Sequence, residues 1–272
     1  MTEPVPAPAL DLDNVGLSFG ARTLWHDLSL GVRPGEFLAV LGANGSGKSS
    51  LLRAILGQQR LTSGSIRVGG QPITRGDRRV GYIPQQKLMA PGVALRGRDL
   101  VTLGLNGHRF GLPVSSRAER ARVDRVIASV GATRFANQPI GFLSGGEQQR
   151  LRVGQAVVGE PMLILADEPL VSLDLHHQRA VSELLDTARR SHDAAVVFVT
   201  HDINPVLGMV DRILYLAGGR FQVGTPDDVL TSEVLSDLYD TPVDVLRIGG
   251  RVVVSGVPDS LNHGHHHVEE AP

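Results

Sequence analysis

The fold of this chain is decided by the segment Gly42-Ala43-Asn44-Gly45-Ser46-Gly47-Lys48-Ser49, which fits the pattern G-x-x-x-x-G-K-[ST] at every fixed position. The apolar run from Phe37 to Leu41 precedes it and has the length of a strand. Residues 50–56 follow it with apolar side chains at helical spacing. A glycine-rich segment between a buried strand and a helix predicts a phosphate-binding loop. The alternative, a glycine-rich turn with a chance lysine, explains neither flank.

The residue types of this loop suit the binding of phosphate. Glycines let the backbone wrap closely around a phosphate chain, in conformations that a Cβ would obstruct. Backbone N–H groups and the positive end of the following helix then face the phosphate oxygens. Lys48 supplies a charge for the β- and γ-phosphates, and the Ser49 hydroxyl supplies a ligand for Mg²⁺. The residues predicted to contact a nucleotide here are Gly42, Ala43, Asn44, Gly45, Ser46, Gly47, Lys48, Ser49 and Ser50.

Composition and charge indicate an ordinary globular protein. The chain has 272 residues, of which 42% are hydrophobic and 20% charged, enough for one large domain with a sizeable core. Its net charge of −1 gives no basic field that would argue for a nucleic-acid partner. Because it has no cysteine, a disulfide framework and a cysteine-based zinc site are excluded. No stretch reaches about 18 consecutive apolar residues, and the Pro-rich start lacks the features of a signal peptide, so we expect no membrane-spanning segment.

The first part of the chain has the pattern of antiparallel strands. Residues 1–9 are Pro-rich, and we expect them to form a disordered leader. Residues 10–19 and 24–32 alternate as strands around a turn at Gly20-Ala21-Arg22, and residues 65–68 form a short strand. These segments predict an antiparallel β subdomain beside the phosphate loop.

The rest of the chain alternates between strands and helices. After a strand at residues 79–83, helical patterns dominate from about residue 87 to 158, which predicts an inserted helical subdomain. The remaining expected elements are strands at 162–166 and 194–199, helices at 176–190, 203–209 and 225–238, and hairpins at 212–223 and 243–255. The alternation predicts an α/β fold with a mainly parallel core sheet, with the main domain at residues 10–245 and a hairpin and histidine-rich tail at 246–272.

Two carboxylates end an apolar strand that we expect beside the phosphate loop. Leu163-Ile164-Leu165-Ala166 precedes Asp167 and Glu168. A strand end next to such a loop is where nucleoside triphosphatases hold Mg²⁺, so Asp167 is predicted to orient the metal through its water shell. Glu168 can then face the γ-phosphate and polarise a water for in-line attack. The alternative is that Asp167 and Glu168 only cap a helix, and the phosphate loop nearby argues against this.

A second anion-binding segment is Leu143-Ser144-Gly145-Gly146-Glu147-Gln148-Gln149-Arg150, which exposes backbone amides and a hydroxyl at a helix N-terminus. Together with the phosphate loop, it resembles the nucleotide-binding subunit of an ABC transporter, whose signature is Leu-Ser-Gly-Gly-Gln or a close variant. The resemblance covers roughly residues 10–245. It implies an ATPase that binds ATP and Mg²⁺ between two copies arranged head to tail. Ser144, Gly145, Gly146 and Glu147 would then contact the ATP held by Lys48 of the other copy.

The resemblance also implies roles for four further residues. Phe19 aligns with the aromatic residue that stacks on adenine, and Gln85 with the glutamine that reaches Mg²⁺ and the attacking water. His201 aligns with the histidine that contacts the γ-phosphate, and Asp174 with the interface aspartate. The implied catalytic set is therefore Glu168, His201, Lys48 and Gln85, and the implied Mg²⁺ ligands are Ser49, Gln85 and Asp167.

The chain departs from the family pattern at two places. Glu147 stands where the commonest signature has glutamine, which puts a carboxylate near phosphate. The usual Pro-Thr-Ser-Ala-Leu-Asp run reads Pro169-Leu170-Val171-Ser172-Leu173-Asp174, so two polar positions are apolar. Both changes fall on segments that the resemblance assigns to the interface between the two copies.

The resemblance further implies partners and a location. These are a separate integral-membrane permease, a second copy of the chain, and an extracytoplasmic substrate-binding protein acting through the permease, with the ATPase at the cytoplasmic face of the membrane. The region around Val80 to Lys87 is similar to the zinc and manganese importer group, and the tail segment Asn262-His263-Gly264-His265-His266-His267 offers imidazoles to Zn²⁺. The tail equally fits a solvated or added sequence. We expect import of zinc or manganese; the alternatives are import of an iron–siderophore or cobalamin-type chelate, and a soluble ABC ATPase without a transport role.

Overall fold

The computed structural model describes residues 7–85, 89, 92–107 and 116–256. Its centre is a six-stranded sheet in the order β10-β9-β3-β8-β7-β6. The pairs β3–β8, β3–β9, β6–β7 and β7–β8 are parallel, and only the edge strand β10 runs antiparallel to β9. The strands are β3 (Phe37–Gly42), β6 (Val80–Ile83), β7 (Leu163–Asp167), β8 (Ala195–Val199), β9 (Arg212–Ala217) and β10 (Arg220–Gly224). The predicted α/β fold with a mainly parallel sheet is confirmed.

A second sheet packs beside the first and is antiparallel, in the order β2-β1-β4-β5. Its strands are β1 (Leu10–Phe19), β2 (Arg22–Val32), β4 (Ser63–Val68) and β5 (Gln71–Pro72). Residues 1–6 of the predicted leader lie outside the described residues. The leader prediction does not hold for Ala9, which is buried and whose carbonyl accepts a hydrogen bond from the Gly69 N–H at 3.1 Å.

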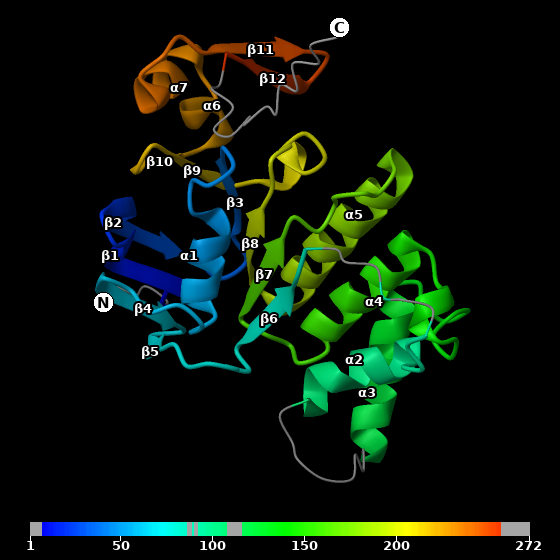
Figure 1. The fold of residues 1–272 in the computed structure, drawn as a ribbon. Helices are drawn as coiled ribbons and strands as arrows, with labels where there is room; N and C mark the ends of the chain where they lie inside the picture. Colours follow the sequence, from blue (N-terminus) through cyan, green and yellow to red (C-terminus); the bar gives the residue numbers. More distant parts are fainter. Residues whose placement is uncertain (1–6, 86–88, 90–91, 108–115, 257–272) are drawn as a thin grey trace, which may run out of the picture.

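The two faces of the central sheet are covered by different layers. Along β3, Phe37, Ala39 and Leu41 join the core shared with the helical part of the molecule. Leu38 and Val40 point the other way, into a core shared with α1 (Lys48–Ile55) and the antiparallel sheet. This alternation follows from the twofold repeat of a strand. It fixes β3 rigidly from both sides, and the phosphate loop follows directly from its end (Figure 1).

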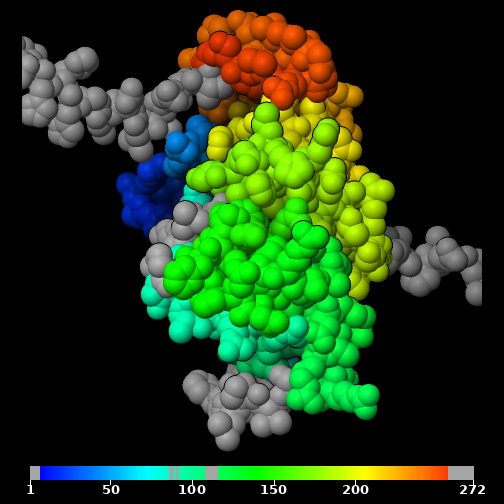
Figure 2. Space-filling model, turned by 90° about the vertical axis from the view of Figure 1, so that its right-hand side faces the viewer, coloured from blue at the N-terminus to red at the C-terminus, as the bar shows by residue number. Residues whose placement is uncertain are grey.

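The helical subdomain lies between β6 and β7 in the sequence, as the helical patterns indicate. It contains α2 (Gly97–Asn106), α3 (Arg117–Ser129), a 3₁₀ turn (Ile140–Phe142) and α4 (Gly145–Val157). Figure 2 views the molecule from this side, where the green helical subdomain lies below α5 (Leu175–His192) and the orange C-terminal elements form the top. The side chain of Ser116 begins α3 with a capping box completed by Glu119.

Two of the predicted helices differ from the structure. In place of a helix over residues 203–209 there is only the 3₁₀ turn Leu207–Met209, because Asp202 Oδ1 accepts the Asn204 N–H at 3.0 Å and closes a local turn. The segment 225–238 contains two helices, α6 (Pro226–Val229) and α7 (Ser232–Tyr239). The break is at Leu230, and the Thr231 side chain accepts a hydrogen bond from the Val234 N–H at 3.2 Å and starts the second helix. The hairpin of β11 (Asp244–Ile248) and β12 (Arg251–Ser255) follows.

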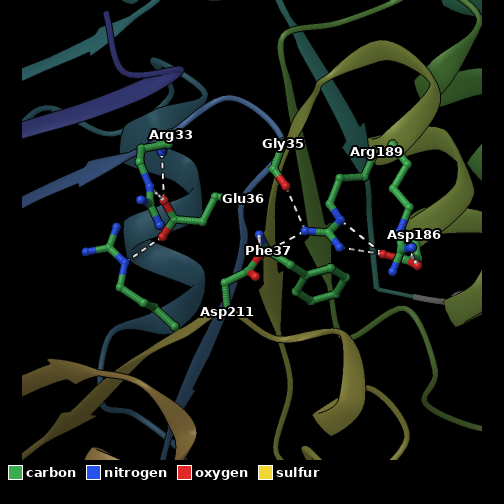
Figure 3. A network of polar contacts seen from close by, with 9 residues as sticks. Arg33, Gly35, Glu36, Phe37, Asp186, Arg189 and Asp211 are labelled. Carbon is green, nitrogen blue, oxygen red and sulfur yellow. Dashed lines mark hydrogen bonds and ion pairs between the residues drawn. The ribbon is translucent and has the colours of Figure 1, made fainter. Parts of the chain in front are cut away.

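A polar network holds the start of β3 in place (Figure 3). Buried Glu36 accepts hydrogen bonds from Arg33 N–H at 2.8 Å and from Arg212 Nε at 2.5 Å. One residue on, the Phe37 N–H donates to Asp211 Oδ2 at 2.7 Å, and Arg189 Nη1 donates to the same oxygen at 2.9 Å. Burial raises the pKa of Glu36, but the hydrogen bonds from Arg212 and Arg33 outweigh it and leave that pKa below its usual value.

Candidate nucleotide site

The phosphate loop connects β3 to α1, as the motif predicts. Gly47 is the residue before the helix and has φ 100°, a left-handed conformation that favours glycine. The buried Lys48 ammonium turns back along the loop and donates to the carbonyls of Gly42 at 2.6 Å and Ala43 at 3.0 Å. Burial lowers the pKa of Lys48, while the nearby carboxylates of Glu168 and Asp167 raise it. The cation is thus held at the centre of the loop, where a phosphate chain would lie.

A cavity of 460 Å³ adjoins this loop and gathers many of the predicted nucleotide contacts. Half-exposed Phe19, at the end of β1, forms one wall, and Glu168 forms another. The loop residues that line it are Asn44, Gly45, Gly47, Lys48, Ser49 and Ser50. Two neighbouring cavities are lined by the other loop residues, with Gly42, Ala43 and His201 in one and Ala43, Gly45 and Ser46 in the other. The residues that line the first cavity offer an aromatic ring, Phe19, and a cation, Lys48, together with backbone amides of the loop.

The two predicted carboxylates lie at the end of β7 and differ in their surroundings. Burial raises the pKa of Asp167, with a further rise from the charge of Glu168, while Arg53, Lys48 and a hydrogen bond with Tyr82 lower it. Glu168 has φ 44°, unusual for a residue with a side chain, and its N–H donates to the Val199 carbonyl of β8 at 2.9 Å. The left-handed φ of Glu168 therefore gives these two adjacent carboxylates different surroundings.

Gln85 and His201 both approach the Glu168 carboxylate. Gln85 Nε2 donates to Glu168 Oε2 at 2.9 Å, so the end of β6 is connected to the end of β7. His201 Nδ1 lies 3.9 Å from Glu168 Oε1, a distance of charge contact but too long for a hydrogen bond. Gln86, the next residue, lies outside the described residues. The structure thus brings Gln85 and His201 to the carboxylate of Glu168, and Glu168 lines the same cavity as Lys48.

The signature segment begins α4 and is folded as a capping box. The Glu147 carboxylate accepts hydrogen bonds from the Ser144 N–H at 2.8 Å and the Ser144 hydroxyl at 2.9 Å. The carboxylate of Glu147 therefore completes a capping box, in which Glu is a favoured third residue of the helix. Asp174 begins α5 in a similar way and accepts from the His177 N–H at 2.9 Å. The His177 ring packs on Gly146, where a Cβ would come within 2.1 Å of its Cδ2, so the two helix starts are joined.

The signature and Asp174 do not line the cavity at the phosphate loop of the same chain, which is formed by ten of the described residues. Two residues of that lining, Arg22 and Leu24 of β2, were missed in the sequence. The pairing of Phe19 with Arg22 across the Gly20-Ala21 turn could have indicated them, because it puts Arg22 beside the aromatic platform.

Together, the loop between β3 and α1, its buried lysine and the carboxylates at the end of β7 define a P-loop nucleoside triphosphatase. The chain also matches the family described as ABC transporter over residues 25–171. It is 33% identical over 233 residues to the zinc import ATP-binding protein ZnuC of Halorhodospira halophila (85% of this chain, 83% of that protein). It is 33% identical over 262 residues to the hemin import ATP-binding protein HmuV of Rhodococcus jostii (90% and 87%).

Among solved structures, one of an inward-facing metal-chelate type ABC transporter matches with a TM-score of 0.76 and 30% identity, covering 90% of this chain and 95% of that one. A cassette of an ABC transporter in its ADP conformation, MJ1267, has the same fold with a TM-score of 0.72 at 18% identity. The chain therefore belongs to the ABC transporter family, as an ATP-binding subunit that hydrolyses ATP. Among the described residues, no helix is long and apolar enough to span a bilayer.

Proposed function

We propose that two copies of this chain close head to tail on two ATP–Mg²⁺ and that hydrolysis drives a separate membrane permease that imports its substrate. The observation that carries this is the arrangement around Glu168, whose carboxylate accepts from Gln85 at 2.9 Å at the rim of the cavity that Lys48 lines. A carboxylate held in that place can orient and deprotonate a water for attack on the γ-phosphate. Several relatives are named import ATP-binding proteins, which supports import.

Mg²⁺ fits the oxygen donors of the site. Ser49 offers a hydroxyl, Asp167 a carboxylate and Gln85 an amide oxygen, all of which are hard ligands. No group of three or more His, Asp or Glu among the described residues could hold a metal by itself. So few protein ligands suit a cation that is also coordinated by phosphate oxygens and water. Mg²⁺ is usually bound in this way. Bound there, it would neutralise charge on the β- and γ-phosphates.

The head-to-tail dimer is supported by where the signature lies. The signature segment begins α4, and a helix N-terminus can bind an anion, yet this segment lies outside the cavity formed around Lys48. Donors supplied by a second copy would complete that cavity and surround the phosphates with preorganised dipoles. In this arrangement Asp174 of each copy lies close to the shared interface.

A permease helix is proposed to contact the helical subdomain. A cavity of 710 Å³ lies between α2, α3 and β6, and it is lined by both apolar and charged side chains, including Tyr82, half-exposed Leu103 and Arg122. Tyr82 of β6 lines this cavity, and Gln85 follows the same strand and contacts Glu168, so β6 connects Glu168 with the cavity. The chain would act at the cytoplasmic face of the membrane, with a substrate-binding protein on the other side.

A divalent metal, zinc or manganese, is the substrate that we propose. It is supported by the resemblance around Val80 to Ile83 and by relatives named for zinc import. The histidine-rich tail, which also suggested metal, lies outside the described residues. A metal chelate is the second candidate, favoured by the relative named for hemin import and by the structure of a metal-chelate type transporter.

The substrate is tested by the zinc, manganese and iron content of metal-limited cells that lack the chain and carry either the wild type or Lys48→Ala. We expect one metal to fall and only the wild type to restore it, because Lys48→Ala removes the cation that holds the phosphates. A fall in iron alone that is specific to chelated iron would favour the second candidate. Unchanged levels of all three would reject metal import.

A further inference from the structure

The start of β2 contacts the phosphate loop. Arg22, the first residue of this strand, is paired with Phe19 across the turn and lines the same cavity. Its Nη2 donates to the Gly45 carbonyl at 3.0 Å. Gly45 has φ 78°, so the guanidinium is bonded to one of the left-handed positions of the loop. Arg22 therefore ties the hairpin that carries the aromatic platform to the loop that carries the phosphate donors.

Trp25, three residues further along β2, forms the floor under Gly47. This side chain is fully buried, and a Cβ added to Gly47 would lie 2.6 Å from its Nε1 and 3.1 Å from its Cδ1. Leu24 adds a contact at 3.3 Å. The indole N–H has no hydrogen-bond partner among the residues that the structure describes, although a buried Trp N–H usually has one. The indole N–H of Trp25 lies against the loop and can donate to a loop carbonyl once the loop adjusts to phosphate.

These contacts surround a loop that has few bonds of its own. Inside the loop, the Ser46 N–H donates to the Ala43 carbonyl at 3.2 Å, and Lys48 holds the Gly42 and Ala43 carbonyls. The Gly45 carbonyl is held by Arg22 of β2, while Gly47 accepts from the Leu51 N–H of α1 at 2.8 Å and packs against Trp25 of β2. Ordering a residue costs conformational entropy, so a loop ordered in advance binds its ligand more tightly.

We propose that Arg22 and Trp25 are positioning residues for ATP, which hold Gly45 and Gly47 in the conformation that binds phosphate and thereby set nucleotide affinity. The proposal deepens the ATP-binding role and does not depend on the dimer or on the transported substrate. Neither residue is assigned to polarise water or to hold metal. Their loss is therefore expected to affect binding, while the chemical step at Glu168 continues once the site is filled.

The experiment measures ADP–Mg²⁺ binding by calorimetry, because ADP occupies the phosphate loop without hydrolysis. For Arg22→Gln we expect the dissociation constant to rise about tenfold, since a hydrogen bond from a charged group is lost. For Trp25→Phe, which removes the N–H without changing charge, we expect a rise of about threefold, the size of a modest neutral hydrogen bond. The control is Arg67→Gln, the same change at an exposed arginine of β4 with no contact to the loop, and it should bind like the wild type.

Two further readouts separate positioning from a general loss of structure. KM for ATP should rise with the dissociation constant, while kcat at saturating ATP stays within about twofold. Amide hydrogen exchange in residues 43–48 of the nucleotide-free protein should become faster in Arg22→Gln, because the bond to the Gly45 carbonyl is lost. If Trp25→Phe does not fold, Arg22→Gln still tests the proposal, because Arg22 is exposed.

Unchanged ADP affinity in Arg22→Gln, or weaker binding without faster exchange in the loop, overturns the proposal. Loss of kcat with KM unchanged also overturns it, since that would place the effect on chemistry. Failure of the wild type to bind ADP would be a different result: it would reject the nucleotide site itself.

Discussion

At the scale of single residues, the site depends on how the backbone presents Glu168. Its left-handed φ of 44° costs about 1 kcal/mol or more for a residue with a Cβ. The bond from its N–H to Val199 and the contact with Gln85 hold it there. A non-glycine residue kept in such a conformation by its neighbours is a feature of functional sites. The conformation would allow Asp167 and Glu168, which are adjacent in the chain, to take the different roles that we propose for them.

Glu168→Gln is expected to lower ATP hydrolysis by about 10²–10³-fold while ATP still binds, because the amide keeps the size and the Gln85 contact but cannot take a proton. ATP should then remain trapped between two copies. Light scattering with saturating ATP–Mg²⁺ should show a dimer for this variant, and Lys48→Ala serves as the control that stays monomeric. A Glu168→Gln protein that remains monomeric would contradict the proposed closed state.

The residues found from the sequence and those missed differ in what determines their position. Lys48, Asp167 and Ser144 belong to short segments whose local backbone builds the site, so a motif suffices to find them. Arg22 and Trp25 reach the loop only because β2 packs across it, more than 19 positions away in the chain. Their role depends on strand register and on the packing of two sheets, which residue patterns do not specify. Glu147 lies between these cases. The motif locates this residue, but only the structure shows its hydrogen bonds with Ser144.

At the scale of elements, β3 is the strand on which the site depends, and its entry is fixed by the network around Glu36. Elements with one strong period were predicted well, as β1 matches its predicted span and β12 does as well. The helices predicted over 203–209 and 225–238 differ from the structure for the same reason. In both, side-chain oxygens of Asp202 or Thr231 compete for backbone N–H groups and end or restart the helix locally.

Glu36→Gln is expected to lower the free energy of unfolding at pH 7 by about 1–3 kcal/mol, the value of hydrogen bonds to a charged group. Since the pKa of Glu36 is lowered in the folded state, its contribution is complete above the ordinary glutamate pKa of about 4.3 and is lost as pH falls through the lower, folded pKa. The difference between wild type and variant in urea unfolding should therefore shrink below about pH 4. Glu183→Gln, the same change at an exposed position of α5, should show no such difference at any pH. A gap that stays constant down to acid pH would mean that the charge of Glu36 does not stabilise the entry to β3.

At the scale of the whole molecule, the two helix starts that we propose bind phosphate do not share a cavity. Lys48 lies at the start of α1 and Ser144 at the start of α4 in a different subdomain. In the proposed head-to-tail dimer, a twofold axis would let each copy lend its signature to the other. Each ATP site of the dimer would then depend on the loop of one chain and the signature of the other.

This dependence predicts complementation between two inactive variants. Lys48→Ala removes the loop cation, and Ser144→Arg blocks the signature with a large side chain, so each alone should hydrolyse almost no ATP. A mixed dimer has one site with both defects and one site with none. With random pairing and independent sites, an equal mixture should therefore recover roughly a quarter of wild-type turnover, and purified mixed dimers roughly half. Measured on mixed dimers purified through two different tags, turnover no higher than in either variant alone would mean that each ATP site is built within one chain, and the head-to-tail arrangement would have to be given up.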